Sequence, residues 1–80
     1  MDKFLDFKRL SYLGDKVKLK TASSEEKDEF MRLLYQNGDL TEKQFKDYKA
    51  GRNAQEIVDA ALAIGAVLLI AYLIGELLKK

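Results

Sequence analysis

The pattern of hydrophobic and polar residues changes near the end of this chain, where one long apolar stretch begins. Residues 57–78 are almost entirely hydrophobic, and the 16 residues between Asp59 and Glu76 carry no charge. At about 1.5 Å per residue, a helix over 57–78 is long enough to cross the roughly 30 Å hydrocarbon core of a bilayer. Both acids would then lie near the membrane interfaces, where a charge costs far less than at the centre. The pattern predicts a transmembrane helix within residues 53–80.

One side of this predicted helix carries small residues at helical spacing. A period of about 3.6 residues places five positions on that side: Ala61, Gly65, Leu68, Tyr72 and Gly75. Small residues four positions apart let two helix backbones approach closely. We predict that this side forms a helix–helix interface, either between copies of the chain or with a partner span. The alternative is a composition effect, because Gly is frequent in membrane helices generally.

Asp59 and Glu76 are the acidic residues within the apolar stretch. Asp59 lies about 160° around the helix from the small-residue side, and Glu76 lies between the two. In a ring of helices, such acids can face a water-filled lumen. The other interpretation makes them boundary residues at the two membrane interfaces.

The polar part of the chain contains two clear helix starts before the apolar stretch. Ser23 and Glu26 have the spacing of a capping box, and the helix that they open is predicted to run to about Gln36. Gly38 then stops it, because glycine tolerates the left-handed conformation of a helix end. Thr41 begins the next helix with a second capping-box spacing.

Further signals mark the end of that helix and the start of the apolar one. Gly51 is predicted to break or bend the helix that Thr41 begins. Asn53 and Glu56 have a third cap spacing, directly before the apolar stretch. Residues 23–52 are therefore predicted to form a helical hairpin.

The core of this hairpin would be a small group of apolar side chains: Leu34, Leu40, Phe45 and Tyr48. Residues 30–49 resemble the short C-terminal (SHOCT-type) helical hairpin of bacterial membrane-associated proteins. The resemblance rests on Leu33, Leu34, Gly38, Leu40, Thr41, Glu42, Phe45 and Lys49. It implies a small oligomerising or docking hairpin without chemistry of its own. The residues point the same way, since so small a cluster is not stable alone.

Residues 1–22 are predicted to hold one short helix and a linker. The helix covers residues 3–13 and ends at Gly14. It would either lie on a membrane interface through its Phe and Leu side chains or pack on the next helix. Residues 16–20 alternate polar and apolar, but a lone short strand lacks a partner, so they are predicted to be an extended linker.

Composition excludes most catalytic functions. The 80 residues contain no Cys and no His, which removes disulfides, thiolate metal sites and the commonest general base. The five glycines are isolated, so no phosphate loop is present. Basic residues are interleaved with acidic ones, which argues against a nucleic-acid partner. We predict a protein that is not an enzyme and has no cofactor, no metal and no small-molecule substrate.

Charge and position suggest a topology. Charged residues follow Met1 at once, so no secretory signal is expected. Four basic residues precede the apolar stretch, against Lys79 and Lys80 after it: Lys43, Lys46, Lys49 and Arg52. The positive-inside rule then places the N-terminal region in the cytoplasm, with a single-pass anchor at the tail.

Together these patterns predict an all-α chain of short helices and a helical hairpin followed by one transmembrane helix. The leading hypothesis is a non-catalytic, single-span membrane protein that acts by helix–helix association, as a subunit or adaptor of a membrane assembly. Its partners would be the lipid membrane and either copies of itself or another membrane protein. The first alternative is a pore-forming oligomer of the holin or small-toxin kind. The second is a soluble helical oligomer that buries residues 57–78 between subunits.

Overall fold

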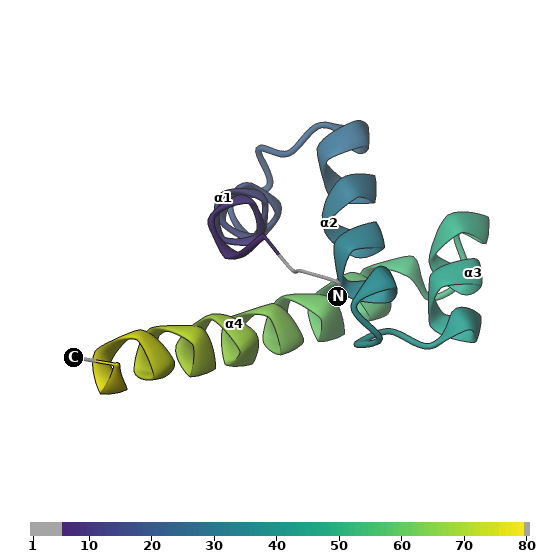
Figure 1. Cartoon of the computed structure of the whole chain (residues 1–80). Coiled ribbons are helices and arrows are strands. Elements are labelled where there is room, and N and C mark those ends of the chain that lie inside the picture. The colour runs from purple at the N-terminus through teal and green to yellow at the C-terminus, as the bar shows by residue number, and fades with distance from the viewer. Residues whose placement is uncertain (1–5, 80) are drawn as a thin grey trace.

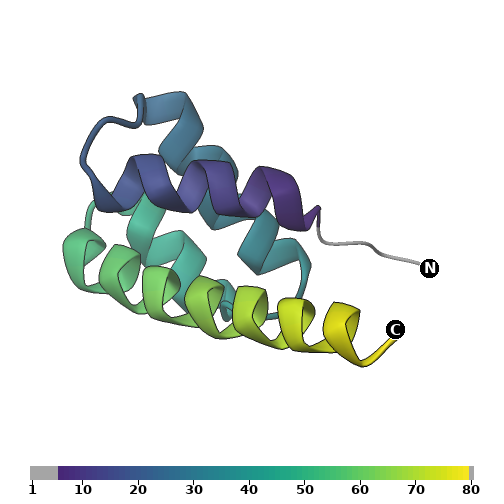
Figure 2. The same ribbon diagram turned by 90° about the vertical axis from the view of Figure 1, so that its left-hand side faces the viewer.

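In the computed structural model, which describes residues 6–79, the chain forms four helices and no strand within that range. They are α1 (Phe7–Lys18), α2 (Ser24–Gln36), α3 (Glu42–Ala50) and α4 (Ala54–Leu78). α4 runs beneath the others, with α3 beside its first turns and its C-terminal end projecting past α1 (Figure 1). Turned by 90°, the molecule shows α1 lying along α4 in the opposite direction (Figure 2). The all-α prediction is confirmed.

Two of the three predicted capping signals form as expected. The Ser23 hydroxyl accepts a hydrogen bond from the Glu26 backbone N–H at 3.1 Å, and the Glu26 carboxylate accepts one from the Ser23 N–H at 2.9 Å. Thr41 and Gln44 make the same reciprocal pair at 3.0 and 2.9 Å. These contacts satisfy backbone donors that the first turn of a helix leaves free. α2 and α3 therefore begin where local sequence predicts.

The third capping prediction is wrong. Asn53 has a left-handed backbone, with φ of 49°, and its side chain makes no cap hydrogen bond. A capping side chain normally belongs to a residue with extended backbone, from which its oxygen can reach the first turn. Gly51 is also left-handed, with φ of 80°, so the chain turns tightly between α3 and α4. The turn geometry at Asn53 replaces the expected cap.

The predicted end of the first helix and the predicted linker are also wrong. α1 continues through Gly14 and ends only at Lys18, so most of the expected linker, residues 16–20, is helical. The part of the predicted helix before residue 6 lies outside the described residues. α1 continues because Val17 is buried in the core, where only a further helical turn can place it. The chain leaves the helix through Lys20, which has a φ of 63°.

A single hydrophobic core joins the N-terminal helix, the α2–α3 hairpin and the apolar helix. α1, α2, the turn before α3, and the first part of α4 all contribute buried side chains to it. These are Leu10, Leu13, Val17, Phe30, Met31, Leu34, Leu40, Ile57, Val58 and Ala61. α3 contains no buried residue and packs against this core through half-buried aromatic rings. The hairpin of α2 and α3 is thus one side of a larger cluster.

Phe30 is the centre of this core, because its ring lies between α1 and α4. A Cβ atom added to Gly14 in α1 would stand 3.4 Å from Phe30 Cε1, and one added to Gly65 in α4 would stand 3.3 Å from Phe30 Cζ. The ring is 1% exposed. Gly14 therefore lies within α1, where it leaves room for the Phe30 ring, and it does not end the helix. The two glycines give the ring the space that side chains would otherwise occupy.

Candidate functional site

The strongest candidate for a functional surface is the part of α4 that the rest of the chain leaves uncovered. Only four residues of α4 are buried, and all lie in its first half: Ile57, Val58, Ala61 and Gly65. Residues 71–79 are all exposed. Large apolar side chains on this uncovered part are more than half exposed: Val67, Ile70, Leu73, Ile74, Leu77 and Leu78. Soluble monomers rarely expose so continuous an apolar surface.

The outer side of α4, opposite the core, is as apolar as the inner side. A helical period of about 3.6 residues places Ala63, Val67, Ile70, Ile74 and Leu77 there. A helix at the surface of a soluble protein normally carries charged and polar residues on this side. α1 follows that rule, with five charged residues in its 12 positions. α4 has no charge between positions 60 and 75, and a helix that is hydrophobic all round requires an apolar environment on every side.

Length agrees with composition. Among the described residues, α4 is the one helix long and apolar enough to cross a membrane. Core helices of soluble proteins can meet the same criterion when they are mostly buried. Only 22% of the most apolar window of α4 is buried within the chain. A single apolar helix of membrane-spanning length is therefore present, as the sequence predicts.

The small-residue side of α4 is a helix–helix contact within this chain. Ala61 is fully buried, and Gly65 lies against the ring of Phe30. Tyr72 stacks on Phe7 of α1, with ring centroids 4.3 Å apart. The predicted interface residue Leu68 is half-buried beside the core. The structure thus places Gly65 against α2, Tyr72 against α1, and Ala61 and Leu68 in or beside the core.

Gly75, the fifth predicted interface residue, has open space around it. No atom stands within 4 Å of a Cβ placed there. Within the chain, the other side of this contact comes from its own N-terminal helices, so an interface with a second copy or a partner span stays a prediction. The missed signal is the apolar spacing of Leu10, Leu13 and Val17, which becomes a stripe only if α1 continues past Gly14.

The two acids of the apolar stretch, Asp59 and Glu76, do not converge. Asp59 is exposed and accepts a hydrogen bond from Gln55 at 2.9 Å. Glu76 pairs with Lys79 at 3.6 Å. The acids are 17 positions apart, which is about 100° around the helix. Each of these two acids therefore has a polar neighbour of its own.

The four predicted hairpin residues lie on one side of the α2–α3 turn. Leu34 and Leu40 are buried, while Phe45 stacks on Tyr35 with ring centroids 4.6 Å apart. The Tyr48 hydroxyl donates a hydrogen bond to Asp28 at 2.5 Å. Burial, and then this hydrogen bond, raises the pKa of the Tyr48 phenol. No local sequence signal predicts this contact, because its two residues are 20 positions apart.

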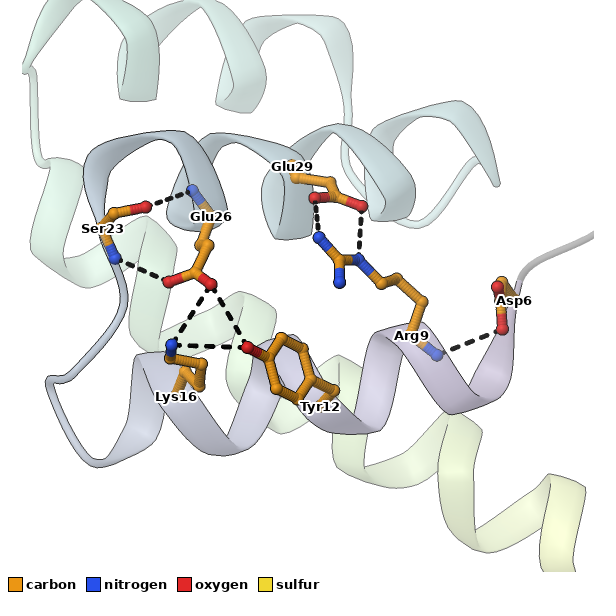
Figure 3. A network of polar contacts seen from close by, with 7 residues as sticks. All are labelled: Asp6, Arg9, Tyr12, Lys16, Ser23, Glu26 and Glu29. Atoms are coloured by element: carbon orange, nitrogen blue, oxygen red, sulfur yellow. Dashed lines mark hydrogen bonds and ion pairs between the residues drawn. The ribbon is translucent and has the colours of Figure 1, made fainter.

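A polar network joins α1 to α2 on the side away from α4 (Figure 3). Arg9 donates two hydrogen bonds to Glu29, at 2.8 Å from Nε and 2.7 Å from Nη2. Lys16 pairs with Glu26 at 3.2 Å. Asp6 caps α1 by accepting a hydrogen bond from the Arg9 backbone N–H at 3.1 Å, a start signal that the sequence reading missed.

These contacts change the acidity of the two glutamates. The Arg9 hydrogen bonds hold the pKa of Glu29 below its usual value. The Ser23 backbone N–H, and then the Lys16 ammonium, lowers the pKa of Glu26. All four side chains are partly exposed, so each pair contributes modestly to stability. The network fixes α1 on α2.

Cavities and ligand clusters offer no competing site. A groove of about 310 Å³ follows one edge of the α1–α4 contact, with an apolar floor that includes Leu10, Leu62 and Leu69. Within residues 6–79, no three acidic side chains come together in a way that could hold a metal ion. The uncovered surface of α4 is therefore the feature that calls for a functional explanation.

Comparison of the chain with protein-family models, curated proteins and solved structures finds no match.

Proposed function

We propose that this chain is a small, non-catalytic membrane protein held in a lipid bilayer by α4, and that it acts by helix association. One observation carries the proposal: the outer side of α4 is apolar along its length, whereas the outer surfaces of α1, α2 and α3 are charged. Transfer of exposed apolar surface from water into lipid is favourable, at about 25 cal/mol per Å². Lipid provides the apolar surroundings that the outer side of α4 lacks within the chain.

A second copy of α4 is a poorer cover for this surface in water. Val67, Ile70, Ile74 and Leu77 have the alternating spacing of three and four residues that a coiled coil uses. They extend over only about two heptads, whereas coiled coils sustain this spacing for about three to four and carry charges on both flanks. The flanks here are uncharged. The surface therefore favours lipid over a soluble oligomer.

The region before α4 would lie in the cytoplasm and would bind the partner. The resemblance of residues 30–49 to the SHOCT-type hairpin supports a docking role for α2 and α3. Basic residues near the start of α4 support a cytoplasmic position for this region. They include Lys43 and Lys46, which are exposed and pair with acids on α3. The partner would be another membrane protein or further copies of this chain.

A pore is the less favoured membrane function. Acids that line one lumen must face the same side of the helix. Asp59 and Glu76 differ by about 100° around α4. We expect Asp59→Asn and Glu76→Gln to leave membrane potential unchanged in cells that express the chain, as the parent chain does. Collapse of the potential by the parent chain, abolished by these variants, would establish the pore instead.

Alkaline carbonate extraction of membranes from expressing cells tests the proposal. We expect the chain to remain in the pellet. Val67→Lys together with Ile70→Lys should release it, because each lysine at the centre of a span costs about 2.5–3.5 kcal/mol. Both positions are more than half exposed, so the core keeps its contacts. Gln55→Lys is the control, since it places a lysine at an exposed position of α4 before the apolar stretch.

A soluble oligomer, the second alternative, predicts the opposite result of the extraction. Recovery of the parent chain in the soluble fraction, as an oligomer by light scattering, would show that residues 57–78 are buried between subunits.

Protease added to sealed cells distinguishes the two orientations of a membrane-bound chain. A cytoplasmic N-terminal region should be cut only after the cells are opened.

A further inference from the structure

The contact between α1 and α4 conflicts with a transmembrane position for α4. Phe7 stacks on Tyr72 near one end of the contact, and Val17 lines a cavity with Val58 near the other. The contact therefore follows α4 over 14 positions, roughly 21 Å of its length. Those positions lie inside the stretch that would occupy the hydrocarbon core. A bilayer around α4 would have to displace α1 or contain it.

Containing α1 in the hydrocarbon core is unfavourable. It carries five charged side chains in its 12 residues: Lys8, Arg9, Asp15, Lys16 and Lys18. Charged groups in a bilayer interior are costly and normally face a protein or water-filled interior. α2 adds Glu26 and Glu29, which are bound to α1 by the polar network. The described packing is therefore compatible with water and incompatible with full insertion of α4.

We propose that α1 and α2 form a detachable cover, which shields one side of α4 in water and leaves it when α4 enters a bilayer. This inference rests on the proposed membrane function. The packed arrangement is the form before insertion. After insertion, lipid takes the place of α1 and α2 around α4.

The distribution of polar contacts indicates where the cover separates. Arg9–Glu29 and Lys16–Glu26 join α1 to α2. Within residues 6–79, no hydrogen bond or salt bridge joins α4 to either helix. The contacts with α4 are apolar, and the 310 Å³ groove leaves part of the α1–α4 boundary unfilled. Lipid can replace apolar contacts without leaving any polar group unpaired, so α1 and α2 leave α4 together, with α2 still joined to α3 through Tyr48 and Asp28.

The released unit is itself amphipathic. Its side toward α4 carries Leu10, Leu13 and Phe30, all fully buried in the packed form. Its outer side carries the charged network. Such a helix pair fits the interface of a bilayer, with apolar side chains among the acyl chains and basic side chains near anionic headgroups. The membrane surface thus provides a place for the cover after it leaves α4.

Reversible cross-links test this order of events, because the chain contains no Cys. Phe7→Cys with Tyr72→Cys, joined by a short bis-methanethiosulfonate reagent, ties α1 to α4. Arg9→Cys with Glu29→Cys, joined in the same way, ties α1 to α2 and is the matched control. The chain also lacks Trp, so Ile70→Trp on the exposed side of α4 reports depth. Vesicles of phosphatidylcholine and phosphatidylglycerol, brominated deep in the acyl chains, quench this reporter.

We expect the α1–α4 link to abolish deep quenching and dithiothreitol to restore it in the same sample. The α1–α2 link should leave quenching unchanged. Deep quenching of the α1–α4-linked protein would overturn the cover, as would loss of quenching in the α1–α2-linked control. Absence of deep quenching in every sample, including the unlinked parent with only Ile70→Trp, would instead refute the membrane function. Far-UV circular dichroism before lipid addition verifies that each linked protein is helical.

Discussion

The inner and outer sides of α4 have similar composition and opposite surroundings. On the inner side Ala61 is fully buried and Gly65 lies against the ring of Phe30. Val67 and Ile70 on the outer side are 66% and 57% exposed. In α1 the corresponding contrast is built into the sequence, with apolar residues inside and charged residues outside. The comparison shows that α4 is suited to two environments, the core of this chain and a lipid phase.

Deleting a large apolar side chain tests this contrast most severely. Phe30→Ala should lower the free energy of unfolding by about 3–5 kcal/mol, because it empties the space between α1 and α4. That loss is large for a domain of this size. Ile70→Ala, a deletion on the outer side, should change it by less than about 0.5 kcal/mol. Urea unfolding in aqueous buffer at low protein concentration, followed by circular dichroism, measures both. Equal losses would mean that the two sides are packed alike.

Enlarging a glycine gives the next largest difference. Gly65→Leu forces a side chain against the Phe30 ring, so we expect a loss of about 1–3 kcal/mol. Gly75→Leu enters open space and replaces glycine by a good helix former, which should stabilise α4 by up to about 1 kcal/mol. The same unfolding measurement compares them. A destabilising Gly75→Leu would reveal a contact at Gly75 beyond those within the chain.

A hydroxyl placed on each side probes solvation at nearly constant volume. Val58 is 4% exposed, so Val58→Thr should cost about 1–2 kcal/mol by burying an unpaired hydroxyl. Val67→Thr at an exposed position should cost less than about 0.5 kcal/mol. Thermal unfolding of the two variants beside the parent provides the measurement. Similar shifts in Tm would contradict a dry inner side.

Acid should weaken the contact between α1 and α2, and this is the smallest of the expected effects. The pKa of Glu29 is lowered in the folded chain, so its contribution is fully present above its unfolded pKa of about 4.3 and is lost as pH falls through the folded pKa. The parent should therefore lose stability below about pH 4. Glu29→Gln should show a shallower decline in a pH series of thermal unfolding curves. Identical pH profiles would show that the Arg9–Glu29 pair does not stabilise the fold.

Local signals in the sequence predicted local structure well. The capping boxes at Ser23 and Thr41 involve residues three positions apart, so their outcome depends little on the rest of the fold. The all-α architecture and the long apolar helix follow equally from periodicity and composition. These features need no knowledge of which helices meet.

Features that depend on distant residues could not be predicted in the same way. Gly14 has the appearance of a helix end, but its role is set by Phe30, 16 positions away. The small-residue side of α4 has a spacing that favours helix contact, yet spacing does not specify the other helix. Asn53 has a good capping side chain, but Gly51 and Asn53 are both left-handed, and the side chain of Asn53 makes no hydrogen bond to the first turn of α4. In each case tertiary contacts or turn geometry override a local preference.

The position of the Phe30 ring between two glycines also has an evolutionary consequence. A Cβ at Gly65 would stand 3.3 Å from the ring and one at Gly14 would stand 3.4 Å from it, so the ring leaves little room for anything larger on either helix. A related chain with a side chain larger than Ala at position 14 or 65 should therefore carry a smaller side chain at position 30. We expect these three positions to change together across homologues. The total side-chain volume at positions 14, 30 and 65 should stay nearly constant, although the three residues lie on three different helices.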